Sequence, residues 1–530
     1  MKKTNAENKK NCSKSISPST GDSIGYSPRH SVTDLQQAVK KAKEVQKDWA
    51  TFPIKKRCHL IRLVQNFMVE KADELAQIIS YDNGKTRVDA FLAEVIPATI
   101  AVSYYTKQAG KFLRDCSLKP SSMAFLNKHT KIVRIPYGVV GIISPWNYPF
   151  SIAFSEVIMA ILAGNAVVLK TATETQMVGL ALKECIEAAQ LPEGIFTYVN
   201  MPGRIAGNAF IESGINKIFF TGSVTVGKQI MSKAAQTLTP VNLELGGNDA
   251  MLICKDANLY RAAAGAVWAG FHNAGQSCGS IERIYVHEAV YDPFLKILKQ
   301  KVEALKTGID SSFEVDIGVM TTQEQIGLVR NHVNEALSKG AVLFAQSELS
   351  KKPYSSNSFP AMILTNVDHT MKVMREETFG PVIGVMRVRN AEEAVSLAND
   401  SNLGLTGSIW STDIKKANKI AREIQAGVIT INDHLISHAM PEASWGGFKE
   451  SGIGRTHGKL GFDEMTYPQT IVNDLIPQLS RNFWWYPSDR ILYIGLKGLL
   501  NGLYSRQWSG RLKGFIHLSK LIPRLFKSNQ

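Results

Sequence analysis

The sequence lacks the patterns that mark several large classes of protein. Its six cysteines are scattered without a CxxC pair, which argues against a zinc site or a disulfide framework and predicts reduced thiols in a cytoplasmic setting. It has no zinc finger, no RNA-binding aromatic motif and no other nucleic-acid module, so we expect no nucleic acid partner despite a net charge of +15. The polar start, Met1-Lys2-Lys3, leads into no apolar stretch and is not typical of a secretory signal.

Long hydrophobic runs are also scarce. The longest uncharged run covers the 21 residues from Ile135 to Ser155, a length that would suit a membrane helix. Pro145 and Pro149 interrupt it, as do two glycines. The run is therefore predicted to be a buried strand, a loop and the start of a helix.

The composition is that of a globular enzyme, with charge concentrated at one end. A chain of 530 residues, 44% hydrophobic and 20% charged, is long enough for two or three domains. From Arg481 to the end, nine Lys and Arg stand against one acid, a local net charge of +8. The other 480 residues carry about +7, so the basic character belongs mainly to the tail.

A thiol and a carboxylate lie beside glycines in two short motifs. Glu244 precedes Gly246 and Gly247. Cys278 lies 34 residues after Glu244 and follows Gly275. Glycines at such places indicate a close approach of the backbone to another group. A thiolate can attack a carbonyl but needs a base or positive surroundings to form, and a carboxylate in an apolar stretch can serve as a base.

One amide side chain stands in a loop pinned by proline. A buried strand is predicted over 139–143, and Trp146 and Asn147 follow it between Pro145 and Pro149. Asn147 has two interpretations, a turn amide that satisfies local backbone or a fixed N–H donor for an oxyanion.

Two further strands end in residues suited to a nucleotide. The strand 166–170 ends in Lys170, and the strand 217–221 leads into Gly222, Ser223 and Gly227 at the start of a helix, where free N–H groups can bind a phosphate. The second pattern is nearly a P-loop, but Gln229 stands where the magnesium ligand belongs. A P-loop-like nucleotide enzyme therefore remains an alternative class.

Together these motifs resemble the aldehyde dehydrogenase superfamily. Glu244-Leu-Gly-Gly and Gly275-Gln-Ser-Cys278 are similar to its two signature motifs, and the resemblance extends from about Asp22 to Asp474. It implies an α/β fold with an open-sheet, Rossmann-type cofactor domain, an α/β catalytic domain and a small oligomerisation hairpin. The expected organisation is a disordered leader (1–21), a cofactor-binding domain (22–117 and 139–246), a catalytic domain (247–450), an oligomerisation hairpin and strand (118–138 and 465–474) and a basic amphipathic extension (475–530).

The resemblance also implies the chemistry. An aldehyde, NAD or NADP and water would give a carboxylate through a thiohemiacetal and a thioester on Cys278. Asn147 would stabilise the oxyanion and Glu244 would activate the water, with no metal ion. The residues expected to contact the cofactor are Trp146, Lys170, Thr173, Gly222, Ser223, Gly227, Leu245, Glu377 and Phe379. At position 173 the family usually has a glutamate that binds the ribose hydroxyls; Thr173 lacks the charge that repels a 2′-phosphate, which predicts that NADP is accepted.

Substrate and location stay open at this stage. The run from Gln276 to Arg283 resembles a succinate-semialdehyde dehydrogenase branch, which suggests succinic semialdehyde. The segment 481–530 carries leucines and aromatic residues at helical spacing among basic residues, which suits either a peripheral membrane contact or packing on the protein. The first option favours a medium or long-chain aldehyde oxidised at a membrane surface, or a non-catalytic membrane scaffold. By the family resemblance, the protein is expected to be a cytoplasmic homodimer or homotetramer.

Overall fold

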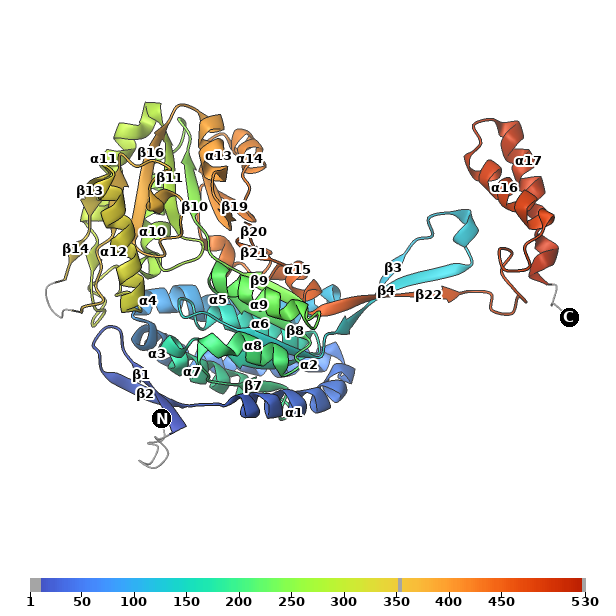
Figure 1. Cartoon of the computed structure of the whole chain (residues 1–530), viewed down its shortest axis with the longest axis horizontal. Coiled ribbons are helices and arrows are strands. Elements are labelled where there is room, and N and C mark those ends of the chain that lie inside the picture. Colours follow the sequence, from blue (N-terminus) through green and yellow to red (C-terminus); the bar gives the residue numbers. More distant parts are fainter. Residues whose placement is uncertain (1–10, 351–354, 527–530) are drawn as a thin grey trace. The chain divides into compact units, whose positions relative to one another are not determined.

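The computed structural model describes residues 11–350 and 355–526. The chain forms two compact units (Figure 1). The first consists of the residues up to Leu113 together with Pro136–Tyr467, and the second of Arg114–Ile135 together with the residues from Pro468 on.

A six-stranded sheet forms the core of the first half of the larger unit. Its order is β21-β9-β8-β5-β6-β7, and all neighbours are parallel except the short β21. Every residue of β5, β6 and β8 is buried, as their continuous apolar runs predict for strands covered on both faces. The strands are β5 Val139–Ile143, β6 Ala166–Lys170, β7 Phe196–Tyr198, β8 Lys217–Thr221, β9 Val241–Glu244 and β21 Gly452–Ile453.

Helices cover this sheet and share one hydrophobic core with it. The run beginning at Ile135 becomes β5, a loop and a helix that starts at Ser151, as predicted. The helices are α1 Val32–Thr51, α2 Ile54–Glu70, α3 Ala72–Asn83, α5 Ile96–Phe112, α6 Ser151–Leu162, α7 Gln176–Glu187, α8 Gly203–Glu212 and α9 Val224–Ala235.

A second sheet begins directly after the Gly246-Gly247 pair. Its order is β13-β15-β16-β11-β10-β18-β19, parallel except for the edge strand β13, and it has its own core. The α/β class predicted from the sequence is confirmed. The strands are β10 Asp249–Ile253, β11 Ile281–His287, β13 Val342–Gln346, β15 Met362–Thr365, β16 Val382–Val388, β18 Thr406–Trp410 and β19 Val428–Ile431. The covering helices are α10 Leu259–Phe271, α11 Tyr291–Glu303, α12 Gln323–Ser338, α13 Ala391–Asn399 and α14 Ile414–Ala421.

One helix in the described part of the chain is long and apolar enough to cross a membrane. It runs from Arg87 to Phe112, through α4 (Arg87–Ala90), a π-helical turn (Phe91–Val95) and α5. Half of its apolar window is buried inside the larger unit, which is typical of a core helix.

The predicted disordered leader is wrong over residues 12–21. Strands β1 (Cys12–Ile16) and β2 (Ser23–Pro28) form an antiparallel hairpin, while residues 1–10 lie outside the described part. Polar side chains hold the hairpin, since Ser15 donates to Asp82 at 2.5 Å and Ser27 is fully buried. The polar composition predicts disorder, but the Ser15 hydroxyl bonds to a buried carboxylate that is distant in the sequence, which orders the hairpin.

The smaller unit contains a three-stranded sheet and a helical hairpin. The sheet has the order β22-β4-β3, built from β3 Cys116–Leu118, β4 Lys128–Pro136 and β22 Thr466–Asp474. Strand β22 thus pairs with β4 of its own chain, and an ion pair between Lys128 and Asp474 links them. The hairpin consists of α16 Arg490–Tyr504 and α17 Trp508–Ser519.

Candidate active site

The cysteine of the second motif follows a strained stretch of backbone. Asn273, Ala274 and Gly275 have positive φ angles of 53°, 55° and 69°. Two successive non-glycine residues in this region are costly and persist only where the surroundings enforce them. A Cβ on Gly275 would lie 2.3 Å from the backbone of Gly380, so this turn is pressed against the Glu377–Pro381 segment. The turn thereby fixes the position of Cys278, which follows it.

The glycines of the first motif bring three motifs together. A Cβ on Gly247 would lie 2.1 Å from the Cys278 carbonyl oxygen, and one on Gly246 would lie 2.3 Å from Glu377 Oε2. The Gly247 amide also donates to Glu377 Oε1 at 3.1 Å. The close approach expected of these glycines is therefore real, and what approaches them is the cysteine loop and Glu377.

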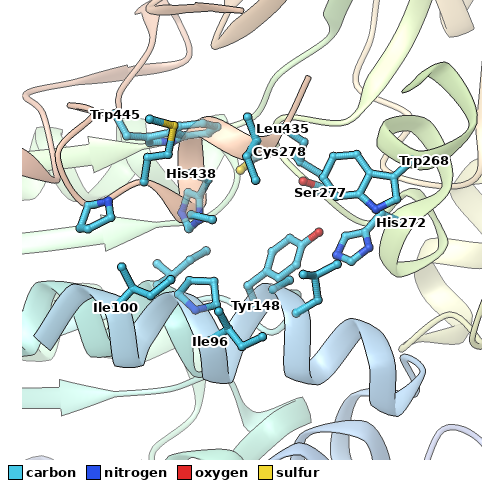
Figure 2. Close-up of a pocket in the computed structure, with 18 of the residues that line it drawn as sticks. Ile96, Ile100, Tyr148, Trp268, His272, Ser277, Cys278, Leu435, His438 and Trp445 are labelled. Atoms are coloured by element: carbon cyan, nitrogen blue, oxygen red, sulfur yellow. The ribbon is translucent and has the colours of Figure 1, made fainter. Parts of the chain in front are cut away.

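Cys278 lines two sizeable cavities and one small void. One sizeable cavity has a volume of about 380 Å³ and is walled mostly by apolar residues from α5, from Trp268 of α10 and from the segment 435–445 (Figure 2). The other, of about 260 Å³, lies toward the end of the first sheet. A group held in either cavity therefore reaches the same sulfur.

The apolar cavity carries little charge. Within the described residues its lining contains no lysine or arginine, and its one acid is Glu442. Burial lowers the pKa of His438 to about 4, so this side chain is neutral at pH 7. His272 also lines it, with its Nδ1 held 3.0 Å from Asp89 and its ring stacked on Tyr148, so these contacts hold its ring in place.

The oxyanion candidate is held in place by buried groups. Asn147 is 3% exposed, and its Nδ2 donates to the carbonyl of Gln276, two residues before Cys278, at 3.1 Å. Its backbone carbonyl accepts from Lys85 Nζ at 2.7 Å and from Asn273 Nδ2 at 2.9 Å. The second Nδ2 hydrogen is left for a ligand, and Asn147 Oδ1 has no partner within the described residues.

A buried ion pair supports this loop, and sequence reasoning missed it. Lys85 and Glu94 have fully buried side chains with Nζ and Oε1 2.6 Å apart. The other carboxylate oxygen of Glu94 accepts from the amides of Phe150 (2.7 Å) and Ser151 (3.3 Å). The pair thus fixes both the carbonyl of Asn147 and the start of α6. No local pattern predicts it, because Lys85 lies in the loop between α3 and α4 and Glu94 in the π-helical turn, and only the fold buries them together.

Glu244 ends β9 in a buried position with an acidic neighbour. Both its carboxylate oxygens lack a hydrogen-bond partner within the described residues, and one oxygen of Glu156 does too. Burial, with the charge of Glu156 as a second cause, raises the pKa of Glu244 well above its ordinary value. Burial raises the pKa of Glu156 to about 8. Both line a void of about 10 Å³ beside Cys278, close to the least space one water needs.

The thiol has acids around it rather than cations. Burial raises the pKa of the Cys278 thiol far above its ordinary value, and the charges of Glu377, Asp249 and Glu244 raise it further. The positive surroundings that would ionise a thiol are therefore not supplied by the described side chains nearby. The thiol needs a base, and Glu244 is the unpartnered carboxylate in the same cavities.

Most of the residues expected to contact a cofactor share the second cavity. Ser223 caps α9, because its side chain accepts from the Val226 amide at 3.4 Å. Since Ser223 lines the cavity, the N-terminus of α9 lies at the cavity wall. Unpartnered buried oxygens on Thr221 and Glu244 in the lining of this cavity fit a polar, extended ligand such as a dinucleotide. The expected residues that line it are Asn147, Trp146, Gly222, Ser223, Glu244, Leu245, Cys278, Glu377 and Phe379.

Three expected cofactor residues do not line this cavity. Lys170 is buried at the end of β6, next to β5 in the sheet, and its carbonyl accepts from Ser144. Thr173 is exposed and donates to Glu174 at 3.2 Å. Gly227 packs under the Leu245 side chain, where a Cβ would lie 2.6 Å away. Lys170 and Thr173 stand at the edge where an open sheet binds the far end of a dinucleotide, whereas Gly227 serves packing.

A second carboxylate that sequence reasoning passed over positions the Glu377 loop. Glu282 is 2% exposed and its Oε1 accepts from the amides of Thr378 (2.9 Å) and Phe379 (2.8 Å). Its Oε2 accepts from Asn248, the residue that follows Gly247. Glu282 thereby fastens the segment that carries Glu377 to the end of the first motif.

Comparisons with known proteins agree with this geometry. The model of the aldehyde dehydrogenase family matches residues 4–471. A 4,4'-diapolycopene aldehyde oxidase of Methylomonas sp is 37% identical over 92% of this chain and 91% of that protein. A putative succinate-semialdehyde dehydrogenase [NADP(+)] of Mycolicibacterium smegmatis is 33% identical over 87% and 88%. The crystal structure of an NAD-dependent aldehyde dehydrogenase from Sinorhizobium meliloti superimposes with a TM-score of 0.84, at 31% identity over 90% of this chain and 93% of that one. The chain belongs to the aldehyde dehydrogenase family, whose members use NAD or NADP.

Proposed function

We propose that this enzyme oxidises an extended apolar aldehyde to its carboxylic acid with NAD or NADP. The observation that carries the proposal is the position of Cys278 at the wall of an apolar cavity of about 380 Å³, whose lining among the described residues includes no lysine or arginine. An alkyl or polyene chain would bury its surface there, and each methylene adds roughly 0.8 kcal/mol of transfer free energy. The Methylomonas relative, named for a diapolycopene aldehyde, supports a substrate of this kind.

The pocket fits succinic semialdehyde less well. A substrate carboxylate would leave water for a cavity whose charged lining residue is Glu442, and a buried carboxylate needs a paired cation or hydrogen-bond donors. Arg283, at the end of the stretch that suggested this substrate, is 2% exposed and donates to the carbonyls of Asn248 and Ala398. It is a structural residue of β11.

The reaction begins with attack on the aldehyde carbon. Glu244 takes the thiol proton, a bond forms between Cys278 sulfur and the carbon, and the carbonyl electron pair moves to oxygen. Asn147 Nδ2 and the Cys278 amide donate to this oxyanion; loss of one such donor typically costs about 2.7–4 kcal/mol of barrier. Glu377 and Phe379 would hold the nicotinamide end of the cofactor, which would supply the hydride acceptor. Cys278 and Asn147 hold the carbon and the oxygen in place while the carbonyl reforms as a thioester on Cys278.

Hydrolysis then uses Glu244 a second time. Glu244 first releases the thiol proton to solvent. It then takes a proton from water as the water oxygen bonds to the thioester carbon. The carbon–sulfur bond breaks, and the departing thiolate takes that proton from Glu244, which restores both the thiol and the carboxylate. The small void shared by Glu244, Glu156 and Cys278 supports this path, since a water there would touch all three.

NADP is proposed as an accepted cofactor. Thr173 is exposed and uncharged, so no acid at that position repels a 2′-phosphate. The name of the Mycolicibacterium relative, with NADP(+), supports this, although the Sinorhizobium structure is named NAD-dependent. Lys228, which a P-loop enzyme would need at the phosphates, pairs instead with Glu450 at the surface, 2.7 Å away.

We further propose a cytoplasmic homodimer or homotetramer that works at a membrane surface. The smaller unit supports assembly, because its three-stranded sheet and the connection between β3 and β4 leave four large apolar side chains exposed, those of Leu118, Met123, Leu126 and Val472. Apolar aldehydes of the size that the cavity admits partition into lipid, which supports a membrane location. Light scattering coupled to gel filtration measures the assembly, and a purely monomeric enzyme would refute it.

Steady-state kinetics test the proposed substrate. Decanal should be turned over with a kcat/KM at least tenfold above that of succinic semialdehyde. Ile100→Arg places a cation in the cavity wall. It should lower kcat/KM for decanal, raise kcat/KM for succinic semialdehyde, and so reduce the difference between the two. Leu328→Arg, on the cofactor side of Cys278, is the matched control and should not favour the semialdehyde. A wild-type enzyme that prefers succinic semialdehyde would overturn the proposal.

A further inference from the structure

The C-terminal hairpin has an inner seam of glycines and an outer apolar stripe. A Cβ on Gly498 would lie 2.7 Å from the Gly514 carbonyl, and one on Gly514 would lie 2.3 Å from the Gly502 amide. The two helices therefore meet backbone to backbone, and their large side chains are turned outward.

The outward side chains of α16 are mainly apolar. Tyr493, Leu496, Leu500 and Tyr504 recur at intervals of three and four residues and lie on one face. Tyr493 and Leu500 are 69% and 60% exposed. Single exposed apolar residues are ordinary, but a whole exposed stripe on one helix needs a partner.

Helix α17 repeats the arrangement. Trp508, Leu512, Phe515 and Ile516 are exposed at helical spacing, and Trp508 is 83% exposed. Between this helix and the loops of the same unit, an apolar crevice of about 550 Å³ opens. The apolar surface is thus larger than either stripe alone.

The charge of the hairpin is of one sign. Its one acid, Asp489, is paired with the buried Arg524. The remaining basic side chains on the exposed surface have no acidic partner within residues 11–350 and 355–526, and they are Arg490, Lys497, Arg506, Lys513 and Lys520. A basic apolar surface of this kind complements the anionic headgroups and acyl chains of a membrane.

We propose that α16 and α17 form an interfacial membrane-docking element that lies in the headgroup region of an anionic bilayer. At 15 and 12 residues, the helices are too short to span a bilayer, which takes about 20. The match to the family model ends at residue 471, so this element is an addition to the catalytic chain. Docking is independent of the proposed substrate, because it involves no residue of the active site.

Vesicle co-sedimentation of the full-length protein, without aldehyde or cofactor, tests the proposal. The protein should bind vesicles of equal parts phosphatidylglycerol and phosphatidylcholine, bind pure phosphatidylcholine much less, and lose affinity as salt rises. Trp508 fluorescence should shift to shorter wavelength on binding, and Trp508→Phe should remove that part of the signal.

Variants of exposed residues separate charge from apolar contact. Lys497→Gln/Lys513→Gln/Lys520→Gln should weaken binding on the order of 100-fold. Lys40→Gln/Lys47→Gln/Lys255→Gln removes the same charge from exposed positions of the larger unit and should weaken it far less. An equal loss in both triple variants would overturn the proposal.

A second set of variants addresses the apolar stripe. Leu500→Ser/Leu512→Ser should weaken vesicle binding at both low and high salt, while aldehyde oxidation in solution is unchanged. If the double serine variant instead dissociates the oligomer in light scattering and still binds vesicles like the wild type, the stripe is a subunit interface and the proposal is wrong. A wild-type protein that leaves anionic vesicles unbound would also refute it.

Discussion

The buried pair of Lys85 and Glu94 offers the sharpest test of how the oxyanion loop is held. Lys85→Met removes a cation whose Nζ lies 2.6 Å from Glu94 and 2.7 Å from the Asn147 carbonyl. Both side chains of the pair are fully buried, so the variant leaves an uncompensated carboxylate in the core. Losing one partner of such a pair typically costs about 3–5 kcal/mol of unfolding free energy.

Replacing both partners should cost less than replacing the lysine alone. Lys85→Met/Glu94→Leu removes the stranded charge, but the amides of Phe150 and Ser151 lose their acceptor, at about 0.5–1.5 kcal/mol each. We expect the double variant to recover part of the stability and little of the activity, because Asn147 stays unsupported.

Chemical denaturation followed by circular dichroism, alongside kcat for decanal, measures both effects. Lys71→Met, which breaks an exposed pair with Glu74, is the control and should change stability by less than about 1 kcal/mol. A Lys85→Met variant as stable as the wild type, or a double variant less stable than the single one, would refute the reasoning.

Three further predictions concern other parts of the site. Thr173→Glu restores an acid that accepts the ribose hydroxyls and should shift kcat/KM from NADP toward NAD; an unchanged ratio would show that this position does not contact the ribose. Glu156→Gln removes the charge that is, next to burial, the largest cause of the raised pKa of Glu244. Because Glu156 has a pKa of about 8, this charge is present only above about pH 8, so kcat of the variant should exceed that of the wild type there and not below. Equal pH profiles of kcat would contradict this coupling. Gly275→Ala places a Cβ 2.3 Å from the Gly380 backbone at φ 69° and should lower both melting temperature and activity, whereas a wild-type melt would mean that the turn relaxes freely.

The strands and glycine motifs were predictable because their signals are local. Continuous apolar runs marked β5, β6 and β8, and the glycines at 246, 247 and 275 marked close approaches that the structure contains. The N-terminal hairpin was not predictable in this way, since its serines are ordered by distant partners such as Asp82.

The supporting residues of the site were out of reach for the same reason. Glu156 lies in the apolar helix α6, where its sequence neighbours give no sign of Glu244 nearby. Lys85 in a loop and Glu94 in a helical turn resemble ordinary surface charges in the sequence, because only the fold buries them together. The apolar cavity is assembled from segments far apart in the chain, so the substrate class could not follow from motifs around Cys278 alone.

The most direct test of the account is rapid mixing of the Glu244→Gln variant with decanal and excess cofactor. Hydride transfer should still occur once per site, more slowly than in the wild type because solvent hydroxide must take the thiol proton in place of Glu244, while hydrolysis of the thioester stalls. The account predicts a burst of NADH or NADPH close to one equivalent per active site, followed by turnover at least a hundredfold slower than wild type. A variant that turns over at the wild-type rate without a burst would contradict it.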